Sequence, residues 1–259
     1  MTSNASANSA AKPKPRRRGR PGRHEESGET RTELIDAAEQ LFAERGFYGV
    51  TTREVATTAG VDDALIYYHF KNKRDLFDAV FERRALVLHT ARHESLVRYE
   101  KRARGKPTVE GAIAAFINPM IDLSQQGDPG WKSYFALVAQ IDNAPWGSEI
   151  IHRFFDPVVY ELVVLLGKAL PDTPQFELYW AYNFLAGSMM LALSETERVD
   201  RLSLGRCHAK DLDAVRHRLL AYCAGGLRAM ISHGATARQN SRGLRAAVAA
   251  PVPSRSARK

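Results

Sequence analysis

Residues 51–70, with the sequence TTREVATTAGVDDALIYYHF, predict two short helices joined by a tight turn. Thr51 and Glu54 have the spacing of a capping box, so a helix is expected to begin directly after Thr51. Gly60 then breaks the chain, and the acidic pair that follows is placed to cap a second short helix. Two short helices around a glycine turn make a helix-turn-helix, in which the second helix enters a groove of DNA.

The second short helix has one apolar face and one polar face. Val61, Ile66 and Phe70 fall near one side of it and are expected to point inward. Two adjacent tyrosines and a histidine on so short a helix suit contacts with a sugar–phosphate backbone better than a core. The side chains left outside are Asp63, Ala64, Tyr67, Tyr68 and His69.

The rest of the chain predicts helices and no strands, because the apolar residues recur every three to four positions. One helix is expected from Thr30 to Gly46, and a long one from Asn72 to about Arg102. Further helices are expected at 108–126, 131–142, 146–155, 157–170, 174–197 and 209–231. The fold class is therefore all-α: a three-helix DNA-binding domain followed by a helical ligand-binding and dimerisation domain.

The formal net charge of +8 is concentrated at the two ends of the chain. Residues 1–29 carry +4 and residues 232–259 carry +6, so the remainder carries −2. Both ends are poor in apolar residues, which predicts disordered basic segments that either contact nucleic acid or are simply solvated. The expected domains are 1–29 (arm), 30–75 (DNA-binding), 76–231 (ligand-binding and dimerisation) and 232–259 (tail).

Residues 31–80 resemble the TetR family of bacterial regulators. The similarity includes IDAAEQLFAERGFYGVTTREVA at 35–56, AGV at 59–61 and IYYHFKNKRDL at 66–76, all in the family's spacing. The resemblance implies phosphate contacts for Thr52 and Arg53, and groove contacts for Asp63, Ala64 and Leu65. It implies backbone contacts for Tyr67, Tyr68 and His69, and a cation, Lys73, at the start of the fourth helix.

The sequence departs from that family at Asp62 and Asp63, where relatives commonly carry Ser, Thr or Lys. Either Asp62 caps the helix and Asp63 favours its dipole, or an acid reads a cytosine amino group. The arm offers a second DNA contact, because Arg18-Gly19-Arg20-Pro21 resembles the core of an AT-hook. Such a segment lies in the narrow minor groove of A·T-rich DNA, and the alternative is a solvated arm.

Aromatic residues are concentrated between positions 131 and 184, which hold twelve of the 23 in the chain. Such a cluster fills a core or lines an apolar pocket with a few polar groups. Parts of 154–180 resemble the C-terminal domain of PsrA-type regulators, which implies a fatty-acid-like effector. The pocket candidates are Trp131, Phe135, Gln140, Trp146, Phe155, Trp180 and Asn183.

The last two expected helices are candidates for a dimer interface. The segment 174–197 is apolar on nearly every face, so it must be covered on all sides. The family resemblance implies that these two helices pair with a second subunit as a four-helix bundle, and a homodimer implies a palindromic operator. The interface candidates are Gly187, Leu191, Leu219, Cys223 and Gly226.

Other classes of protein are disfavoured by what the sequence lacks. It has no nucleophile elbow, phosphate-binding loop or His-Glu-x-x-His motif, so we expect no catalytic residue, cofactor or metal. No apolar run is long enough for a membrane span, and we expect a cytoplasmic location. The favoured function is a repressor released by a small hydrophobic ligand, with acyl compounds as a candidate class. A ligand-responsive activator and a nucleoid-associated DNA-coating protein are the alternatives.

Overall fold

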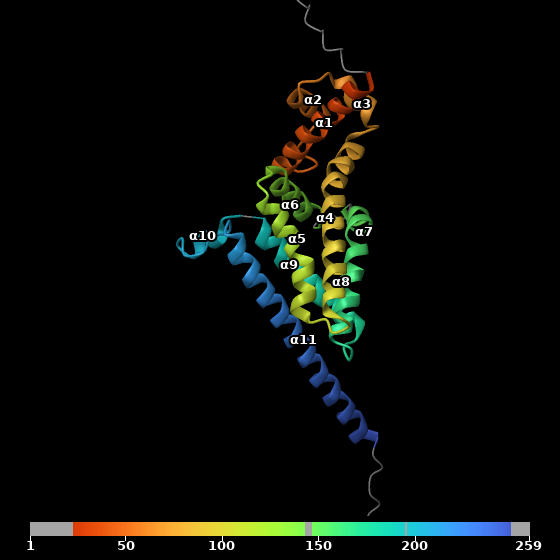
Figure 1. The fold of residues 1–259 in the computed structure, drawn as a ribbon, viewed down its shortest axis with the longest axis vertical. Coiled ribbons are helices and arrows are strands. Elements are labelled where there is room, and N and C mark those ends of the chain that lie inside the picture. The colour runs from red at the N-terminus through yellow and green to blue at the C-terminus, as the bar shows by residue number, and fades with distance from the viewer. Residues whose placement is uncertain (1–22, 143–146, 195, 250–259) are drawn as a thin grey trace, which may run out of the picture.

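The computed structural model describes residues 23–142, 147–194 and 196–249, and within them every regular element is a helix (Figure 1). The all-α fold expected from the sequence is thus confirmed. The helices are α1 (Arg23–Arg45), α2 (Thr52–Ala59), α3 (Asp63–His69), α4 (Lys73–Ala103), α5 (Val109–Gln125), α6 (Pro129–Asp142), α7 (Ser148–Phe154), α8 (Asp156–Ala169), α9 (Gln175–Leu193), α10 (Arg198–Leu202) and α11 (Leu212–Ala249).

The helix-turn-helix forms where the sequence predicts it because its ends are determined locally. The Thr51 hydroxyl accepts a hydrogen bond from the Glu54 amide, and the Glu54 side chain accepts one from the Thr51 amide, which completes the capping box. Gly60 ends α2 in the left-handed conformation at φ 71°, which favours glycine. The Asp62 side chain then accepts from the Ala64 amide and caps α3.

Two helix boundaries differ clearly from the expectation, and one additional helix is present. The first helix begins at Arg23 rather than Thr30, so the Thr30 capping box is wrong and residues 23–29 are not a disordered arm. The last helix continues to Ala249, where a disordered tail was expected from residue 232. Both extensions continue an existing helix, which requires no new nucleation, and the second is rich in Ala and Arg. The short helix α10 was not expected at all.

Helix α4 connects the two domains (Figure 1). It starts beside α1–α3 and runs along the helical domain, where it packs against α5, α6, α7 and α8. Its buried stripe includes Leu76, Val80 and Leu88, and these side chains join one continuous core with residues of α1 and α5. A change in the tilt of α4 therefore moves the DNA-binding end relative to the helical domain.

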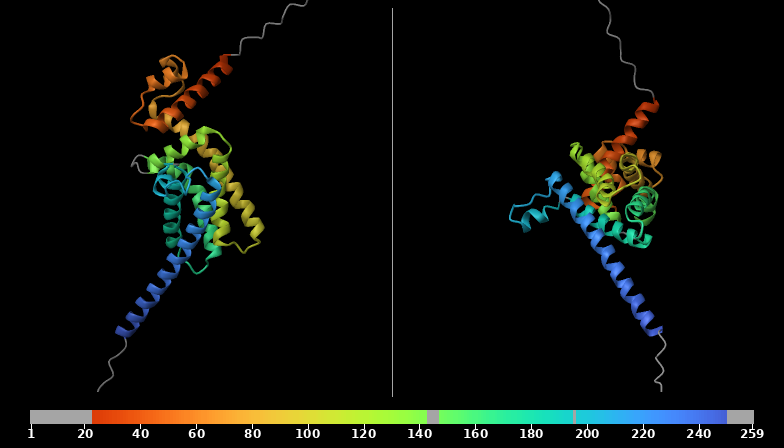
Figure 2. Two further views of the ribbon diagram at one scale, coloured as in Figure 1. Left: turned by 90° about the vertical axis from the view of Figure 1, so that its left-hand side faces the viewer. Right: turned by 60° about the horizontal axis from the view of Figure 1, so that its bottom comes forward.

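Helices α9 and α11 lie side by side on one flank of the helical domain, and α11 projects beyond it (Figures 1 and 2). The short α10 stands away from the body between them (Figure 2). Among the described residues, no helix combines the length and the apolar character that a bilayer span requires.

Candidate DNA-binding surface and ligand-binding domain

The recognition helix α3 is held by its apolar face and presents its polar face outward. Ile66 is completely buried and Phe70 is 5% exposed, so both anchor the helix on the core as expected. Tyr67 and Tyr68 are 64% and 74% exposed. Large aromatic side chains kept this far out of a core are available to contact a ligand.

The side chains around α3 tie it to its neighbours without covering its outer face. The Tyr67 hydroxyl lies 3.4 Å from the Thr52 hydroxyl at the start of α2, so the two expected contact residues are adjacent. His69 is half-buried, and burial together with the nearby Arg31 lowers its pKa. The lowered pKa favours the neutral imidazole, which offers a hydrogen bond rather than a charge. Asp63 and Ala64 are exposed, whereas Leu65 is half-buried.

The two aspartates have different roles. Asp62 is the N-cap of α3, as the first interpretation of this pair predicts. Asp63 lies in the first turn, and its carboxylate is 3.7 Å from the Arg53 guanidinium, in a pair in which both side chains are largely exposed. Arg53 therefore stands beside the recognition helix with an acid close to it, which reduces the positive potential offered to phosphate.

Lys73 lies at the start of α4, with its ammonium 4.5 Å from the centre of the Phe47 ring. Burial lowers the pKa of Lys73, while the nearby Glu54 opposes that shift. Sequence reasoning omitted two exposed neighbours, Tyr48, which is 80% exposed, and Lys71. The signal for both was present, since each lies within a stretch that matches the family motif. Arg18 and Arg20 lie outside the described residues.

A buried ion cluster joins the DNA-binding domain to the helical domain. Glu39 of α1 accepts hydrogen bonds from Arg83 and Arg84 of α4 at 2.8–3.0 Å. Arg84 also contacts Asp128, just before α6. Although burial acts to lower it, these carboxylates raise the pKa of Arg84 above its ordinary value. A Cβ on Gly130 would lie 1.7 Å from Arg84 Nη2, so this junction is tightly packed.

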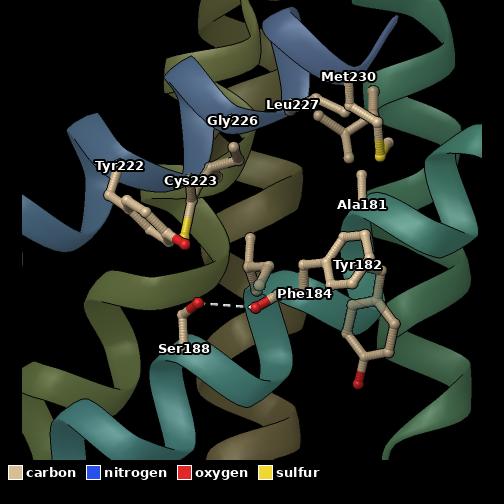
Figure 3. Close-up of a pocket in the computed structure, with 12 residues that line it drawn as sticks. Ala181, Tyr182, Phe184, Ser188, Tyr222, Cys223, Gly226, Leu227 and Met230 are labelled. Carbon is tan, nitrogen blue, oxygen red and sulfur yellow. Dashed lines mark hydrogen bonds between the residues drawn. The ribbon is translucent and has the colours of Figure 1, made fainter. Parts of the chain in front are cut away.

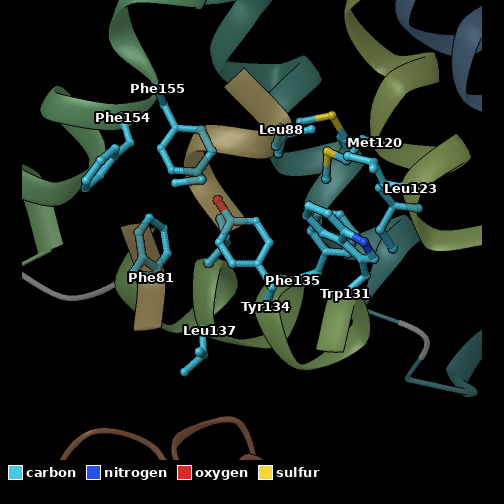
Figure 4. Packing of buried hydrophobic residues seen from close by; sticks show 14 of the residues in the cluster. Phe81, Leu88, Met120, Leu123, Trp131, Tyr134, Phe135, Leu137, Phe154 and Phe155 are labelled. Atoms are coloured by element: carbon cyan, nitrogen blue, oxygen red, sulfur yellow. The ribbon is translucent and has the colours of Figure 1, made fainter. Parts of the chain in front are cut away.

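The pocket candidates do not come together around one cavity. Trp131, Phe135 and Phe155 are at most 8% exposed and belong to the core cluster of Figure 4. Their rings pack on neighbouring aromatics, as in the stacked pair Trp131–Phe135 with ring centres 6.0 Å apart. Trp180 is 57% exposed on α9, and Gln140 and Asn183 are also exposed, so these three candidates do not lie with the buried aromatic residues. Trp146 lies outside the described residues.

The residues expected to contact a second subunit lie on α9 and α11, and two grooves are found there. A mostly apolar groove of about 230 Å³ is lined by side chains that include Tyr182, Phe184 and Tyr222 (Figure 3). A second groove, of about 640 Å³, continues toward α10 and includes Leu191 and Leu219. Neither groove is lined by the expected pocket residues.

The five interface candidates divide into two groups. Gly187 and Gly226 are exposed, and a Cβ at either position would meet nothing within 4 Å in this subunit. Leu191 is 68% exposed. Leu219 and Cys223 instead pack mainly into the subunit's own core, where burial raises the pKa of the Cys223 thiol to about 11.

Comparison with protein families identifies the two domains. Residues 34–80 match the model of bacterial regulatory proteins of the tetR family, and residues 114–226 match that of the tetracyclin repressor-like C-terminal domain. Together the two models match more than half of the chain.

Curated relatives are similar in the DNA-binding part. The HTH-type transcriptional repressor BepR of Brucella suis biovar 1 (strain 1330) is 39% identical over 74 residues, which are 27% of this chain and 35% of that protein. The HTH-type transcriptional regulator AcrR of Shigella flexneri is 41% identical over 58 residues, 22% of this chain and 27% of that protein. The similarity thus spans about a third or less of these relatives' length.

Solved structures share the fold over most of the chain. The transcriptional regulator FadR from Bacillus subtilis, in complex with stearoyl-CoA, has a TM-score of 0.52 at 20% identity, over 75% of this chain and 98% of that one. A TetR-like transcriptional regulator from Rhodococcus sp. RHA1 has a TM-score of 0.52 at 16% identity, over 77% and 96% of the two chains.

Proposed function

Because this chain belongs to the TetR family of bacterial regulatory proteins, we propose that it is a DNA-binding transcriptional repressor. It acts as a homodimer on a palindromic operator and is released by a small hydrophobic effector. The observation that carries this proposal is the recognition helix α3, which is capped at Asp62, anchored by Ile66 and open on the face that bears Tyr67 and Tyr68. A relative with similarity in this part is described as a repressor.

The exposed apolar surface of α9 and α11 supports the homodimer. Trp180, Phe184 and Leu191 on α9 and Tyr222 on α11 are each more than half exposed. A contiguous apolar patch of this kind on a subunit marks an interaction site, and an isologous contact would cover the same patch on both copies. The two-fold axis of such a dimer would place the two α3 helices in successive major grooves.

The effector class is proposed from the core of the helical domain. Three of the expected aromatic residues are packed there with methionines and leucines, which suits an apolar ligand after local rearrangement. A regulator with this fold has been solved with stearoyl-CoA, so acyl compounds are the first class to test. The effector lowers operator affinity by changing the tilt of α4 and with it the spacing of the recognition helices.

Operator selection and point variants test the repressor function. Genomic DNA fragments that the purified protein selects should contain one palindrome, which footprinting should show as a single protected site. Tyr68→Ala and His69→Ala should each weaken binding by about 1–2 kcal/mol while leaving the base preference intact, because each removes a backbone contact.

The matched control is Tyr160→Ala, which removes a tyrosine that is 51% exposed on α8, away from the DNA-binding end. Wild-type affinity in this variant and reduced affinity in the two α3 variants is the expected pattern. Unchanged affinity in both α3 variants, or protection spread over the whole fragment, would refute the proposal.

A further inference from the structure

Arg92 is the most deeply buried charged residue in the described part of the chain. Its side chain lies in the middle of α4 and is 1% exposed. Arginine is almost never fully buried unless a carboxylate or another anion pairs with it, because removing its charge from water is costly. Its surroundings therefore need an explanation.

The groups around the Arg92 guanidinium are neutral. Its Nε donates a hydrogen bond to the Phe116 carbonyl at 3.1 Å, and its Nη2 lies 2.9 and 3.3 Å from the sulfur atoms of Met120 and Met189. The guanidinium carbon is 4.0 Å from the centre of the Phe116 ring. Thioether sulfur is a weak acceptor, so two of these contacts satisfy the charge poorly.

Four other arginines of the same helix show what is missing at Arg92. Arg74, Arg83, Arg84 and Arg98 each have a carboxylate oxygen within 3.4 Å, although all four are more accessible. For Arg92, the nearby polar groups that act on its charge are the tyrosine hydroxyls of positions 134 and 182, and no carboxylate of the described residues is among them. Burial lowers the pKa of Arg92 to about 10, which leaves it a cation at neutral pH.

We infer that Arg92 binds the anionic group of an apolar ligand, and that the ligand class is a hydrophobic monocarboxylic acid. This inference rests on the proposed function and specifies the chemistry of its effector. The planar guanidinium matches a carboxylate with two parallel N–H···O bonds, which would replace the two thioether contacts.

The neighbours of Arg92 explain how an apolar tail would be accommodated. Met120 and Met189 are flexible side chains that move at small cost. Figure 4 shows Met120 next to Trp131 and Phe135 in the aromatic core. On the other side, the Phe116 ring packs edge-on against Tyr182 at 6.2 Å, and Tyr182 lines the groove of Figure 3. The cation thus lies between the aromatic core and a groove that opens to the surface.

The test compares charged and uncharged forms of the same ligand on the full-length protein. A series of saturated fatty acids and arylalkanoic acids is titrated, each beside its methyl ester and its CoA thioester, by calorimetry and thermal shift. The free acid should bind the wild type about tenfold or more tightly than its ester, which cannot pair with the cation. The inference would be overturned if none of the acids binds, or if an ester or thioester binds as tightly as its acid.

Two variants separate anion binding from a structural role. Arg92→Met should fold with an equal or higher melting temperature, because it removes an unpaired buried charge, and it should lose the preference for acid over ester. Arg98→Met, on the exposed side of the same helix, should keep that preference. An Arg92→Met protein that still prefers the acid would contradict the assignment. If Arg92→Met does not fold, the comparison of acid and ester binding by the wild-type protein still tests the inference.

Operator binding by the ligand-free proteins distinguishes the two proposals. Wild type and Arg92→Met should bind the selected operator equally, because Arg92 is remote from α3, and the free acid should release only the wild type. Operator release by a thioester alone would preserve the repressor function and overturn the carboxylate site. A preference for the acid without any operator binding would support the carboxylate site and overturn the repressor function.

Discussion

Single residues at the start of α3 reconcile an acidic recognition helix with DNA binding. Asp62 uses its carboxylate to cap the helix, and its loss would leave an amide of the first turn unsatisfied. Asp63 makes no cap and lies beside Arg53, in a pair that is too exposed to contribute much stability. The two neighbours therefore differ in what each contributes, one to folding and the other to the charge of the DNA-binding surface.

This difference predicts that the two alanine variants change different properties, the stability in one case and the operator affinity in the other. Asp62→Ala should lower the free energy of unfolding by about 1 kcal/mol, because an N-cap is lost. Asp63→Ala should change that free energy by less than about 0.5 kcal/mol and should tighten operator binding, because Arg53 is freed for phosphate. Urea unfolding and gel-shift titration measure the two effects. Weaker DNA binding in Asp63→Ala would instead support direct reading of cytosine.

Glu54 makes the first turn of α2 sensitive to acid. Hydrogen bonds from the Thr51 amide and hydroxyl, and then from Arg45, lower its pKa from 4.5 to about 2. A carboxylate with a depressed pKa stabilises the folded state fully above its ordinary pKa and loses that contribution as the pH falls toward 2. Glu54→Gln should therefore flatten the fall of melting temperature between pH 4.5 and 2. A curve parallel to that of the wild type would contradict the capping-box interpretation of this shift.

At the scale of elements, α9 and α11 have more apolar surface than one subunit covers. Gly187 and Gly226 add to this surface two positions with no side chain and open space in front of them. Positions without a side chain let a partner helix approach closely, so a bulky residue there should hold the two subunits apart. The buried Leu219 and Cys223 cannot have this effect directly, because they pack within their own subunit.

Leucine at the exposed glycines should therefore prevent dimerisation. Gly187→Leu and Gly226→Leu are each expected to shift the protein from dimer to monomer at micromolar concentration, as measured by analytical ultracentrifugation. Glu94→Leu places the same side chain on the exposed part of α4 and should remain dimeric. A wild-type protein that is monomeric under these conditions would exclude the proposed interface.

On the scale of the whole molecule, the cluster of Glu39, Arg83 and Arg84 connects the DNA-binding and helical domains. Glu39 and Arg84 expose only 7% and 14% of their side chains, so the cluster is shielded from salt. Removing one member of a buried ion pair is much more costly than removing an exposed one, because it leaves a buried charge unpaired. The junction is thus a sensitive place at which to uncouple the two domains.

Glu39→Ala should lower the free energy of unfolding by about 3 kcal/mol, because two arginines lose their shared carboxylate. Gly130→Ala should act in the same direction, since its new Cβ would displace the Arg84 guanidinium. The exposed ion pair of Glu94 with Arg98 offers a control. Glu94→Ala should lower the free energy of unfolding by less than about 1 kcal/mol. Urea unfolding followed by circular dichroism measures all three, and equal effects of Glu39→Ala and Glu94→Ala would show that the junction is not special.

The basic segment before α1 is expected to extend the DNA contact of the whole protein. Residues 1–22 contain six Lys or Arg and no acid, and deleting them leaves α1 intact. The deletion should weaken operator binding and reduce the slope of log affinity against log salt by about 0.9 for each lost phosphate contact. A larger loss on A·T-flanked than on G·C-flanked operators supports the hook at Arg18 and Arg20, and an equal loss supports a solvated arm.

The sequence by itself determined the helix-turn-helix. The capping box at Thr51, the left-handed Gly60 and the Asp62 cap act within a few residues, so the same local rules hold before and after folding. Most of the later helices were likewise predictable to within a few residues from their periodicity. The length of α11 was not, because the sequence after residue 231 has helix-forming residues but no apolar stripe that would mark it as packed.

Only the tertiary structure decided which side chains share a site. Trp131 and Trp180 are the same residue type, yet Trp131 is buried and Trp180 is 57% exposed. The difference arises because burial depends on which helices surround each position. Arg92 occupies the buried stripe of α4, four residues after Leu88 and four before Leu96. That spacing was visible in the sequence, but its meaning depends on α5 and α9, which surround the cation with a carbonyl and two sulfurs. Electrostatic environment is a property of the assembled core, and no local pattern determines it.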